Sequence, residues 1–324
     1  MTWSAAPLDE TLRSALPAWG ALGHATTSWD LTLRPTAHAE LSLGRLMGGE
    51  ERWAISHSDG RIAGAWLSSL PWDTSFFGLP MATIGLEGQQ CAEAIRILVP
   101  KAINAAARLG IQHVRVAQRA GAYEAIEALQ ALGFRVRWVS TQITCDTRRL
   151  PQELAPFPAG LTCVDATPEH LGELAAVSRQ IGAYCWPEYD PVLPEQARRA
   201  YVMQRITNCI TTDYADTAVV ALWRGRVVGF HASAVATHAL QGSSSSPYAY
   251  VRDTFVSPKA PPNVGSHLIR AALHGQIGLA QQVTGRVRLD GRAMINTALD
   301  CGYRVTGDEI LFSAHVNAIV GQSA

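Results

Sequence analysis

The stretch of residues 217–235 reads TAVVALWRGRVVGFHASAV. It consists of two apolar runs rich in β-branched residues, 217–223 and 226–235, separated by the dipeptide Arg224-Gly225. Apolar runs of this length on either side of a glycine-containing dipeptide predict a β-hairpin.

This hairpin belongs to an internal repeat. Its turn, Gly225-Arg226-Val227-Val228-Gly229, is matched earlier by Gly60-Arg61-Ile62-Ala63-Gly64. A second string, Gly302-Tyr303-Arg304-Val305, is matched by Gly133-Phe134-Arg135-Val136 at nearly the same separation. Two landmarks with similar offsets predict one architecture that is used twice.

Both halves are expected to have the same order of elements. In the second half, periodicity and turn residues predict strands over 161–164, 217–223, 226–235, 248–256, 283–289 and 304–313, and helices after Thr167, over 194–208, around 268–279 and over 292–300. In the first half they predict strands over 53–57, 62–67, 113–116 and 135–144, and helices around 95–109 and over 124–132. Pro100 is expected to kink or shorten its helix. Strands mixed with helices in this way predict an α/β fold with a mixed sheet.

The two halves are joined by a segment rich in proline. Residues 150–160 contain Pro151, Pro156 and Pro158, which disfavour both helix and central strand, so this segment is expected to be a linker. The chain of 324 residues then divides into an N-terminal half, 1–149, and a C-terminal half, 161–324. At about 150 residues per domain, two domains are the expected number.

Composition excludes several classes of protein. Lys+Arg and Asp+Glu both number 27, and a chain without basic excess is not expected to bind nucleic acid. No apolar run approaches the ~20 residues that span a membrane, and no secretory signal is seen, so a cytoplasmic protein is expected. The six cysteines form no C-x-x-C pair, which favours reduced thiols and predicts no metal site.

Three stretches resemble the GNAT superfamily of GCN5-related N-acyltransferases, and most of all its dTDP-fucosamine (amino-sugar) acetyltransferases. These stretches are residues 70–78, LPWDTSFFG, residues 131–135, ALGFR, and the region 178–201. The resemblance covers about residues 50–146 and 161–315. It implies two tandem GNAT-like halves forming an internal pseudo-dimer, with a structural N-terminal half that forms a wall of the acceptor pocket and a catalytic C-terminal half.

The resemblance also implies acetyl-CoA, or another acyl-CoA, as co-substrate. It would be held by a strand edge and by amides at the start of the following helix, where the helix dipole favours an anion. The corresponding residues here are Thr254, Phe255, Val256, Asn263, Val264, Gly265, Ser266 and His267. The family pattern [QR]-x-x-G-x-[GA] is absent, and Pro261 and Pro262 stand in this loop.

For the catalytic groups, the resemblance points to the same strand. Asp253 is the first candidate for the base and His231, on the neighbouring strand, is the second, while Tyr250 stands where some family members place a catalytic carboxylate. Family members often use a tyrosine to protonate the leaving thiolate, but its positions here hold Ala298 and Leu129. That general acid is therefore expected to be missing from both halves.

Two aromatic segments are candidates for the acceptor site. Their predicted substrate-binding residues are Tyr184, Trp186, Tyr189, Asp190, Trp72, Asp73 and Phe77. The alternative for the segment around Trp72 is core packing. Cys185 is not expected to be a nucleophile, because no base partner is evident.

The sequence thus predicts an acyl-CoA-dependent N-acyltransferase that acetylates a primary amine of a small molecule, such as an amino sugar or a secondary-metabolite intermediate. One alternative is the same fold with a donor bound to an acyl carrier protein, and another is a binding protein without catalysis. A monomer and a homodimer are both open. Residues 1–49 match nothing that indicates a role.

Overall fold

The computed structural model describes residues 3–5, 50–88, 91–151, 153–154, 156–181, 185–237 and 247–320. The chain forms two compact units. Unit 1 comprises Met1–Val139, Tyr189–Ala197 and Gly307–Ala324, and unit 2 comprises Ser140–Glu188 and Arg198–Thr306. Among the described residues, no helix is both long and apolar enough to cross a membrane.

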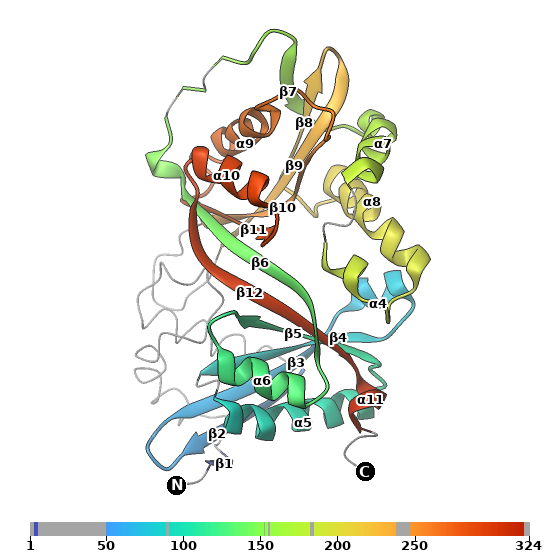
Figure 1. Cartoon of the computed structure of the whole chain (residues 1–324), viewed down its shortest axis with the longest axis vertical. Helices are drawn as coiled ribbons and strands as arrows, with labels where there is room; N and C mark the ends of the chain where they lie inside the picture. Colours follow the sequence, from blue (N-terminus) through green and yellow to red (C-terminus); the bar gives the residue numbers. More distant parts are fainter. Residues whose placement is uncertain are drawn as a thin grey trace. The chain divides into compact units, whose positions relative to one another are not determined.

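Unit 1 is a sheet in the order β1-β2-β3-β4-β5-β12, in which only β4 and β5 are parallel neighbours. Its strands are β1 Trp3–Ala5, β2 Glu51–His57, β3 Ile62–Ser69, β4 Met81–Gly88, β5 His113–Arg119 and the end of β12 Arg304–His315. Its helices are α4 Pro71–Phe77, α5 Ala92–Arg108, α6 Tyr123–Ala131 and α11 Val316–Val320 (Figure 1).

Unit 2 repeats this arrangement in the order β6-β11-β10-β9-β8-β7, again with a single parallel pair, β10 and β11. Its strands are the end of β6 Arg135–Asp146, β7 Leu161–Asp165, β8 Thr217–Trp223, β9 Arg226–Thr237, β10 Pro247–Val256 and β11 Gln282–Arg288. Its helices are α7 Leu171–Ile181, α8 Glu195–Thr211, which begins in unit 1, α9 Val264–Gly275 and α10 Arg292–Asp300. Helices α9 and α10 lie on one face of this sheet, and α7 lies on the other (Figure 1).

The last strands of the two halves are exchanged. β12, from the C-terminal half of the sequence, pairs with β5 from Glu309↔Arg119 to His315↔His113. β6, from the N-terminal half, pairs with β11 from Gln282↔Asp146 to Arg288↔Ser140. The compact units therefore differ from the expected stretches 1–149 and 161–324, because each unit takes its last strand from the other stretch.

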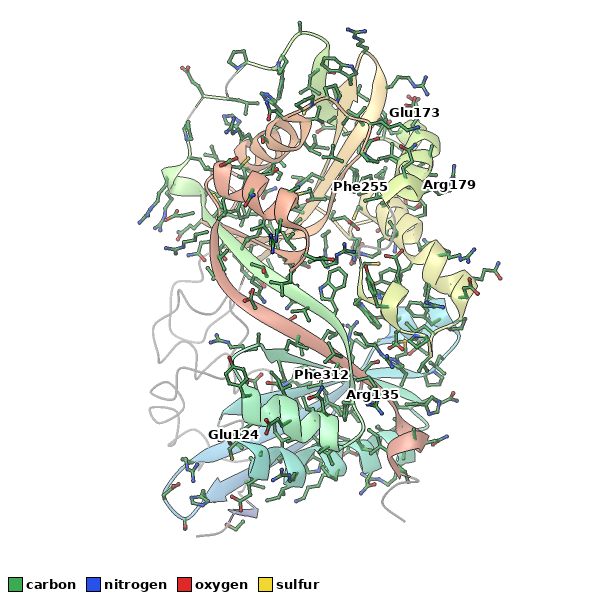
Figure 2. All side chains as sticks on the ribbon, viewed as in Figure 1. Glu124, Arg135, Glu173, Arg179, Phe255 and Phe312 are labelled. Carbon is green, nitrogen blue, oxygen red and sulfur yellow. The ribbon has the colours of Figure 1, made fainter. Side chains whose placement is uncertain are left out.

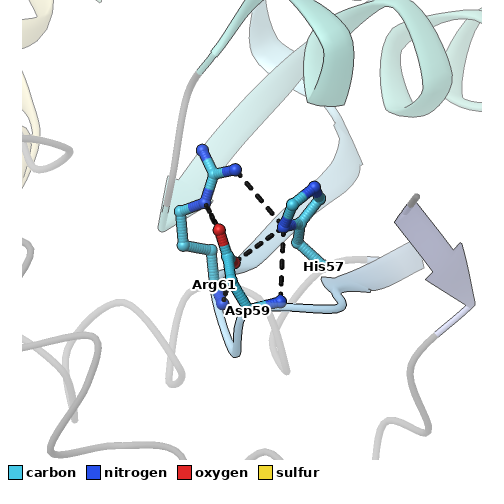
Figure 3. A network of polar contacts seen from close by, with 3 residues as sticks. All are labelled: His57, Asp59 and Arg61. Carbon is cyan, nitrogen blue, oxygen red and sulfur yellow. Dashed lines mark hydrogen bonds and ion pairs between the residues drawn. The ribbon is translucent and has the colours of Figure 1, made fainter. Parts of the chain in front are cut away.

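Both predicted hairpins are present, and their turns use the residues that tight turns require. Gly60 has φ +89°, and Arg224 and Gly225 have φ of 49° and 76°, the positive values of a type I′ turn. Asp59 fixes the first turn: its carboxylate accepts from Arg61 Nε at 2.9 Å and lies 2.7 Å from Nδ1 of His57 (Figure 3). The hydrogen bonds from Arg61 hold the pKa of Asp59 well below its usual range.

Helix α5 shows how core packing overrides a local signal. It continues through Pro100 over 17 residues, so the proline does not shorten the helix, and the alternative expectation of a kink stays a prediction. Ile95, Leu98 and Ala102 are buried in the core of unit 1, and this burial offsets the one hydrogen bond that proline cannot donate.

Each unit has its own aromatic core residues. In unit 2, Phe255 packs against Phe230 with ring centroids 5.5 Å apart. In unit 1, Phe312 of β12 is completely buried among residues of β3, β5 and α5. Figure 2 shows both Phe255 and Phe312 inside their units. A strand from the end of the sequence therefore completes the core of the unit that contains its beginning.

Replacing Phe312 by alanine is expected to destabilise unit 1 by about 3–5 kcal/mol, because a large buried side chain leaves a cavity. Chemical denaturation would measure this loss, and hydrogen exchange should show faster exchange in β5. Val320→Ala, at a position 38% exposed in the same unit, is the control and should change stability by less than ~0.5 kcal/mol. Loss of protection in β11 instead of β5 would contradict the strand exchange.

Candidate functional site

In unit 2, the parallel pair β10 and β11 separates part-way along its length. The two strands pair only at Tyr248↔Gln282, Ala249↔Val283 and Tyr250↔Thr284. Beyond this point each strand pairs only on its outer side, β10 with β9 and β11 with β6. Within the described residues, the inner edge of β10 from Val251 to Val256 has no strand partner. A strand edge that no neighbouring strand covers can bind an extended ligand as an added strand would.

The predicted coenzyme residues Thr254, Phe255 and Val256 lie on this part of β10. On their outer side they pair with His231, Phe230 and Gly229 of β9. Phe255 is 2% exposed and belongs to the core, so only its backbone is available to a ligand.

Helix α9 begins directly after this strand. Asn263 is its N-cap residue and has φ +67°, a left-handed conformation that asparagine tolerates. His267 donates its backbone N–H to the carbonyl of Asn263, and Val264 makes a long contact of 3.5 Å to that of Pro261. Among the described residues, nothing accepts a hydrogen bond from the backbone N–H of Gly265 or Ser266. Two free amides at a helix N-terminus are suited to an anion such as a diphosphate.

The start of α9 also lies against the end of β10. A methyl group added to Gly265 would lie 3.5 Å from the side chains of Val256 and Thr297, so this glycine sits close to the strand. The His267 ring packs on Phe157 with centroids 5.8 Å apart, and partial burial and Arg270 lower the pKa of His267. Gly265 of the predicted helix residues is thus brought next to Val256 of the predicted strand residues.

Asp253, the first candidate for the base, is buried beside an arginine that the sequence analysis did not identify. Its Oδ2 lies 3.6 Å from Nη2 of Arg205 on α8. A β-bulge separates Val251 from Asp253 in the pairing with β9, and Arg205 also donates a hydrogen bond to the carbonyl of Arg252 in that bulge. The bulge therefore directs the Asp253 side chain toward α8, where Arg205 compensates its charge.

His231, the second candidate, lies opposite Thr254 on β9. Its Nδ1 is 2.8 Å from the Thr254 hydroxyl oxygen, and the residue is 2% exposed. Burial lowers the pKa of His231 to about 4, so the imidazole is neutral at pH 7. A neutral, buried imidazole of this kind can hold a hydrogen bond, but it is a weak base.

The remaining catalytic positions are Tyr250 and the two positions at which the resemblance expects a tyrosine. Burial raises the pKa of Tyr250, whose phenol lies beside Arg252. Ala298 on α10 and Leu129 on α6 are buried, apolar residues, as the sequence indicated. Burial also raises the pKa of the Cys185 thiol, which lies 3.3 Å from the Glu188 carboxylate, so this thiol is not activated as a nucleophile.

The first predicted acceptor segment forms helix α4 in unit 1. Trp72 is 40% exposed and stacks on Phe76 at 5.2 Å, whereas Phe77 is buried. Asp73 is buried, with Oδ1 3.9 Å from Nη1 of Arg115. In this segment, Trp72 alone of the three predicted residues exposes a large surface.

The second predicted segment is divided. Tyr184 lies outside the described residues, and Trp186 is a half-buried residue of unit 2. Tyr189 and Asp190 belong to unit 1, where the Tyr189 ring lies 5.8 Å from that of Trp138.

Asp190 is completely buried and holds three side chains of unit 1. Its Oδ2 lies 2.9 Å from Nε2 of His113 and accepts a hydrogen bond from the Ser313 hydroxyl. Its Oδ1 lies 3.3 Å from Nε of Arg137. These groups come from β5, β12 and β6, so Asp190 fixes residues 189–197 to the sheet of unit 1. This geometry favours a structural role for Asp190 over direct contact with an acceptor.

The sequence analysis missed Arg205, Arg252 and the partners of Asp190. One signal was available: Arg252 and Asp253 are adjacent charged residues in an otherwise apolar and aromatic strand, which breaks the alternation of a regular strand and is typical of a bulge. No local signal connects Asp190 with His113, which lies 77 residues away in the sequence.

Comparison with solved structures identifies the fold. A tandem GNAT protein from the clavulanic acid biosynthesis pathway matches with a TM-score of 0.51 at 15% identity, over 97% of this chain and 98% of that one. A GCN5-related N-acetyltransferase from Sphaerobacter thermophilus matches with a TM-score of 0.54 at 15% identity, over 97% and 95%. The fold is that of a tandem GNAT protein.

A third match concerns part of a larger protein. The GCN5-related glucosamine N-acetyltransferase region of a fungal multi-domain GH3 β-N-acetylglucosaminidase matches with a TM-score of 0.50 at 12% identity, over 97% of this chain and 38% of that one. No family model and no curated protein matches the sequence. The tandem GNAT fold confirms the predicted fold class, while the closeness to dTDP-fucosamine acetyltransferases stays a prediction.

Replacing Asp190 by asparagine is expected to destabilise unit 1 by about 3–5 kcal/mol, because it breaks a buried ion pair. Burial alone would raise the pKa of Asp190, but the hydrogen bonds from His113 and Ser313 and the charge of Arg137 lower it below 3.8. The ionised carboxylate therefore contributes stability above pH 3.8, and this contribution is lost as pH falls through the lowered pKa.

Denaturation of the wild type and the variant between pH 7 and pH 3 would measure this difference, which should shrink at the acid end. Asp165→Asn, on an exposed position of β7, is the control and should change little. A difference that stays constant down to pH 3 would contradict the assignment.

His231 is expected to make stability depend on pH in another range. Its pKa is about 4 in the folded protein and 6.5 when exposed, so the unfolded chain binds the proton first. Stability should fall by up to roughly 3 kcal/mol as pH decreases from 6.5 to 4, and His231→Gln should flatten this slope. His170→Gln, which keeps a residue suited to the capping box of Thr167, should leave the slope unchanged.

Proposed function

We propose that this protein is an acyl-CoA-dependent N-acyltransferase that moves an acetyl or short acyl group to a primary amine of a small molecule. The observation that carries this proposal is the early separation of β10 from β11, next to the two free amides of Gly265 and Ser266. A strand edge and a helix N-terminus placed in this way fit the two parts of an acyl-CoA: an amide-containing arm and a diphosphate.

Acyl transfer requires few further groups from the protein: a hydrogen-bond donor for the thioester oxygen and a group that orients the amine or accepts its proton. The inner edge of β10 would orient the thioester and supply a backbone N–H, near Phe255 or Val256, to the oxygen on which negative charge develops. Asp253, held by Arg205, would orient the attacking amine or receive its proton. Since Ala298 stands where an acid would be, coenzyme A would leave as its thiolate without a side-chain acid at that position; thiols of cysteine type have a pKa of about 8.5 and ionise readily.

Two features support the amine acceptor. The likeness to a glucosamine N-acetyltransferase region makes amino sugars the first acceptors to test. The likeness to a protein of the clavulanic acid pathway makes amines of secondary metabolism the second. Both are matches of fold, and the acceptor is part of the proposal.

One observation favours a second candidate, a donor carried by an acyl carrier protein. The loop between β10 and α9 contains Pro258, Pro261 and Pro262, which cannot donate hydrogen bonds, so fewer amides are available for a diphosphate than in a loop without proline. A carrier-bound acyl group lacks the adenosine diphosphate portion and would need only the strand edge. Acetyl-CoA and an acetylated carrier protein offered side by side would separate the two donors.

Calorimetry with acetyl-CoA and thiol release with a panel of amines would test the main proposal. Ser266→Asp should weaken acetyl-CoA binding at least tenfold, because a negative charge would lie at the free amides. Ser266→Asn, similar in shape but neutral, is the matched control. An aspartate in the first turn favours the helix, so lost binding would not reflect lost folding.

Equal affinity of the Ser266→Asp and Ser266→Asn variants for acetyl-CoA would contradict an anion site at the start of α9. Tight acetyl-CoA binding without thiol release from any amine would instead indicate a binding protein without catalysis.

A further inference from the structure

The bulge in β10 presents an arginine that the fold does not need for its own charge balance. The guanidinium carbon of Arg252 lies 4.0 Å from the ring centroid of Tyr214 and 4.2 Å from that of Tyr250. Cation–π contacts of this kind fix the position of the group and leave its N–H donors available.

No carboxylate compensates the charge of Arg252 within the described part of unit 2. Asp253, its neighbour in the chain, pairs with Arg205 instead. Asp216, which influences the ionisation of Tyr250, is exposed and accepts a hydrogen bond from the backbone N–H of Val235. Arg252 is thus a half-buried cation whose contacts are two aromatic rings.

The donors of Arg252 are also unused. Its Nε is buried and has no hydrogen-bond partner among the described residues. The terminal amino groups are not among the buried unbonded atoms, so they reach solvent, and they bond to no described residue. A buried or half-buried cation with unused donors is stabilised when a ligand brings an anion.

The position of this cation connects it with the reaction. The last residue pair between β10 and β11 is Tyr250↔Thr284, so Arg252 stands two residues beyond the point at which the strands separate. Asp253, the candidate partner of the amine, follows it directly. Arg252 thus lies along β10 where the acceptor must approach the thioester.

On the basis of the proposed acyl transfer, we propose that Arg252, held between Tyr214 and Tyr250, binds an anionic group of the amine acceptor, a carboxylate or a phosphate. The planar guanidinium offers paired N–H donors that match both groups.

The direct test uses inorganic phosphate and acetate as probes on the full chain. The Arg252 guanidinium signals in ¹⁵N NMR spectra should shift with either anion, and the signals of Arg224 should not. Arg224 is a matched control, because its guanidinium lies over the Trp223 ring at 5.5 Å in the same unit. Absence of a shift at Arg252 up to about 50 mM of both anions would overturn the proposal.

A kinetic test assigns the anion to the acceptor. Arg252→Gln should raise KM for glucosamine 6-phosphate or 4-aminobutyrate at least tenfold, the size expected for a hydrogen bond to a charged group, and leave KM for glucosamine or 4-aminobutanamide unchanged. Arg224→Gln should change neither. Equal effects of Arg252→Gln on anionic and neutral amines would contradict an anion site in the acceptor pocket.

Acetyl-CoA affinity separates this inference from the function on which it rests. Arg252→Gln should leave the Kd of acetyl-CoA, measured by calorimetry, within about twofold of the wild type. A tenfold loss would assign the anion to the donor and overturn the proposal while leaving acyl transfer intact. Failure of the wild-type protein to bind acetyl-CoA would count against the proposed function, whereas the NMR result would still report on the anion site.

Discussion

The candidate site depends on the point at which two parallel strands stop pairing. β10 and β11 share three residue pairs, and then β10 follows β9 while β11 follows β6. β10 stays hydrogen-bonded to β9, and β11 stays hydrogen-bonded to β6. Each strand is thus held by its outer neighbour, away from the other strand. The inner edge of β10 that no described strand covers therefore begins at Val251, where the pairing with β11 ends.

The bulge in β10 lies just beyond this point, and it explains the distribution of charge around it. An extra residue in a strand leaves a carbonyl outside the ladder, and Arg205 donates a hydrogen bond to it. The same arginine forms an ion pair with Asp253. The guanidinium of Arg252 instead packs on the aromatic rings of Tyr214 and Tyr250. One irregularity of the backbone thus sets the roles of three charged side chains.

Unit 1 has the same strand arrangement as unit 2, but its side chains pack differently around the parallel strand pair. β4 and β5 also pair over a short parallel stretch, from Met81↔His113 to Ile84↔Val116. There, however, the Trp66 side chain covers Gly85 so closely that a methyl group on this glycine would meet the indole ring at 2.0 Å. That unit 2 is the half that holds the donor stays a proposal.

Much of the fold could be predicted from local patterns. Both hairpins, the limits of α10 and the position of the last strand in each half were predicted correctly, because turn residues and side-chain periodicity act over a few neighbouring residues. The sequence also shows that the tyrosine expected as general acid is replaced by Ala298 in one half and by Leu129 in the other. The pairing of β6 with β11 and of β12 with β5 could be seen only in the folded chain, since the same Gly-aromatic-Arg-Val pattern leads into both strands and either strand fits either partner locally. The ion pair of Asp253 with Arg205 and the burial of Asp190 could be seen only in the same way, because contacts between residues far apart in the chain depend on strand register, which local sequence does not specify.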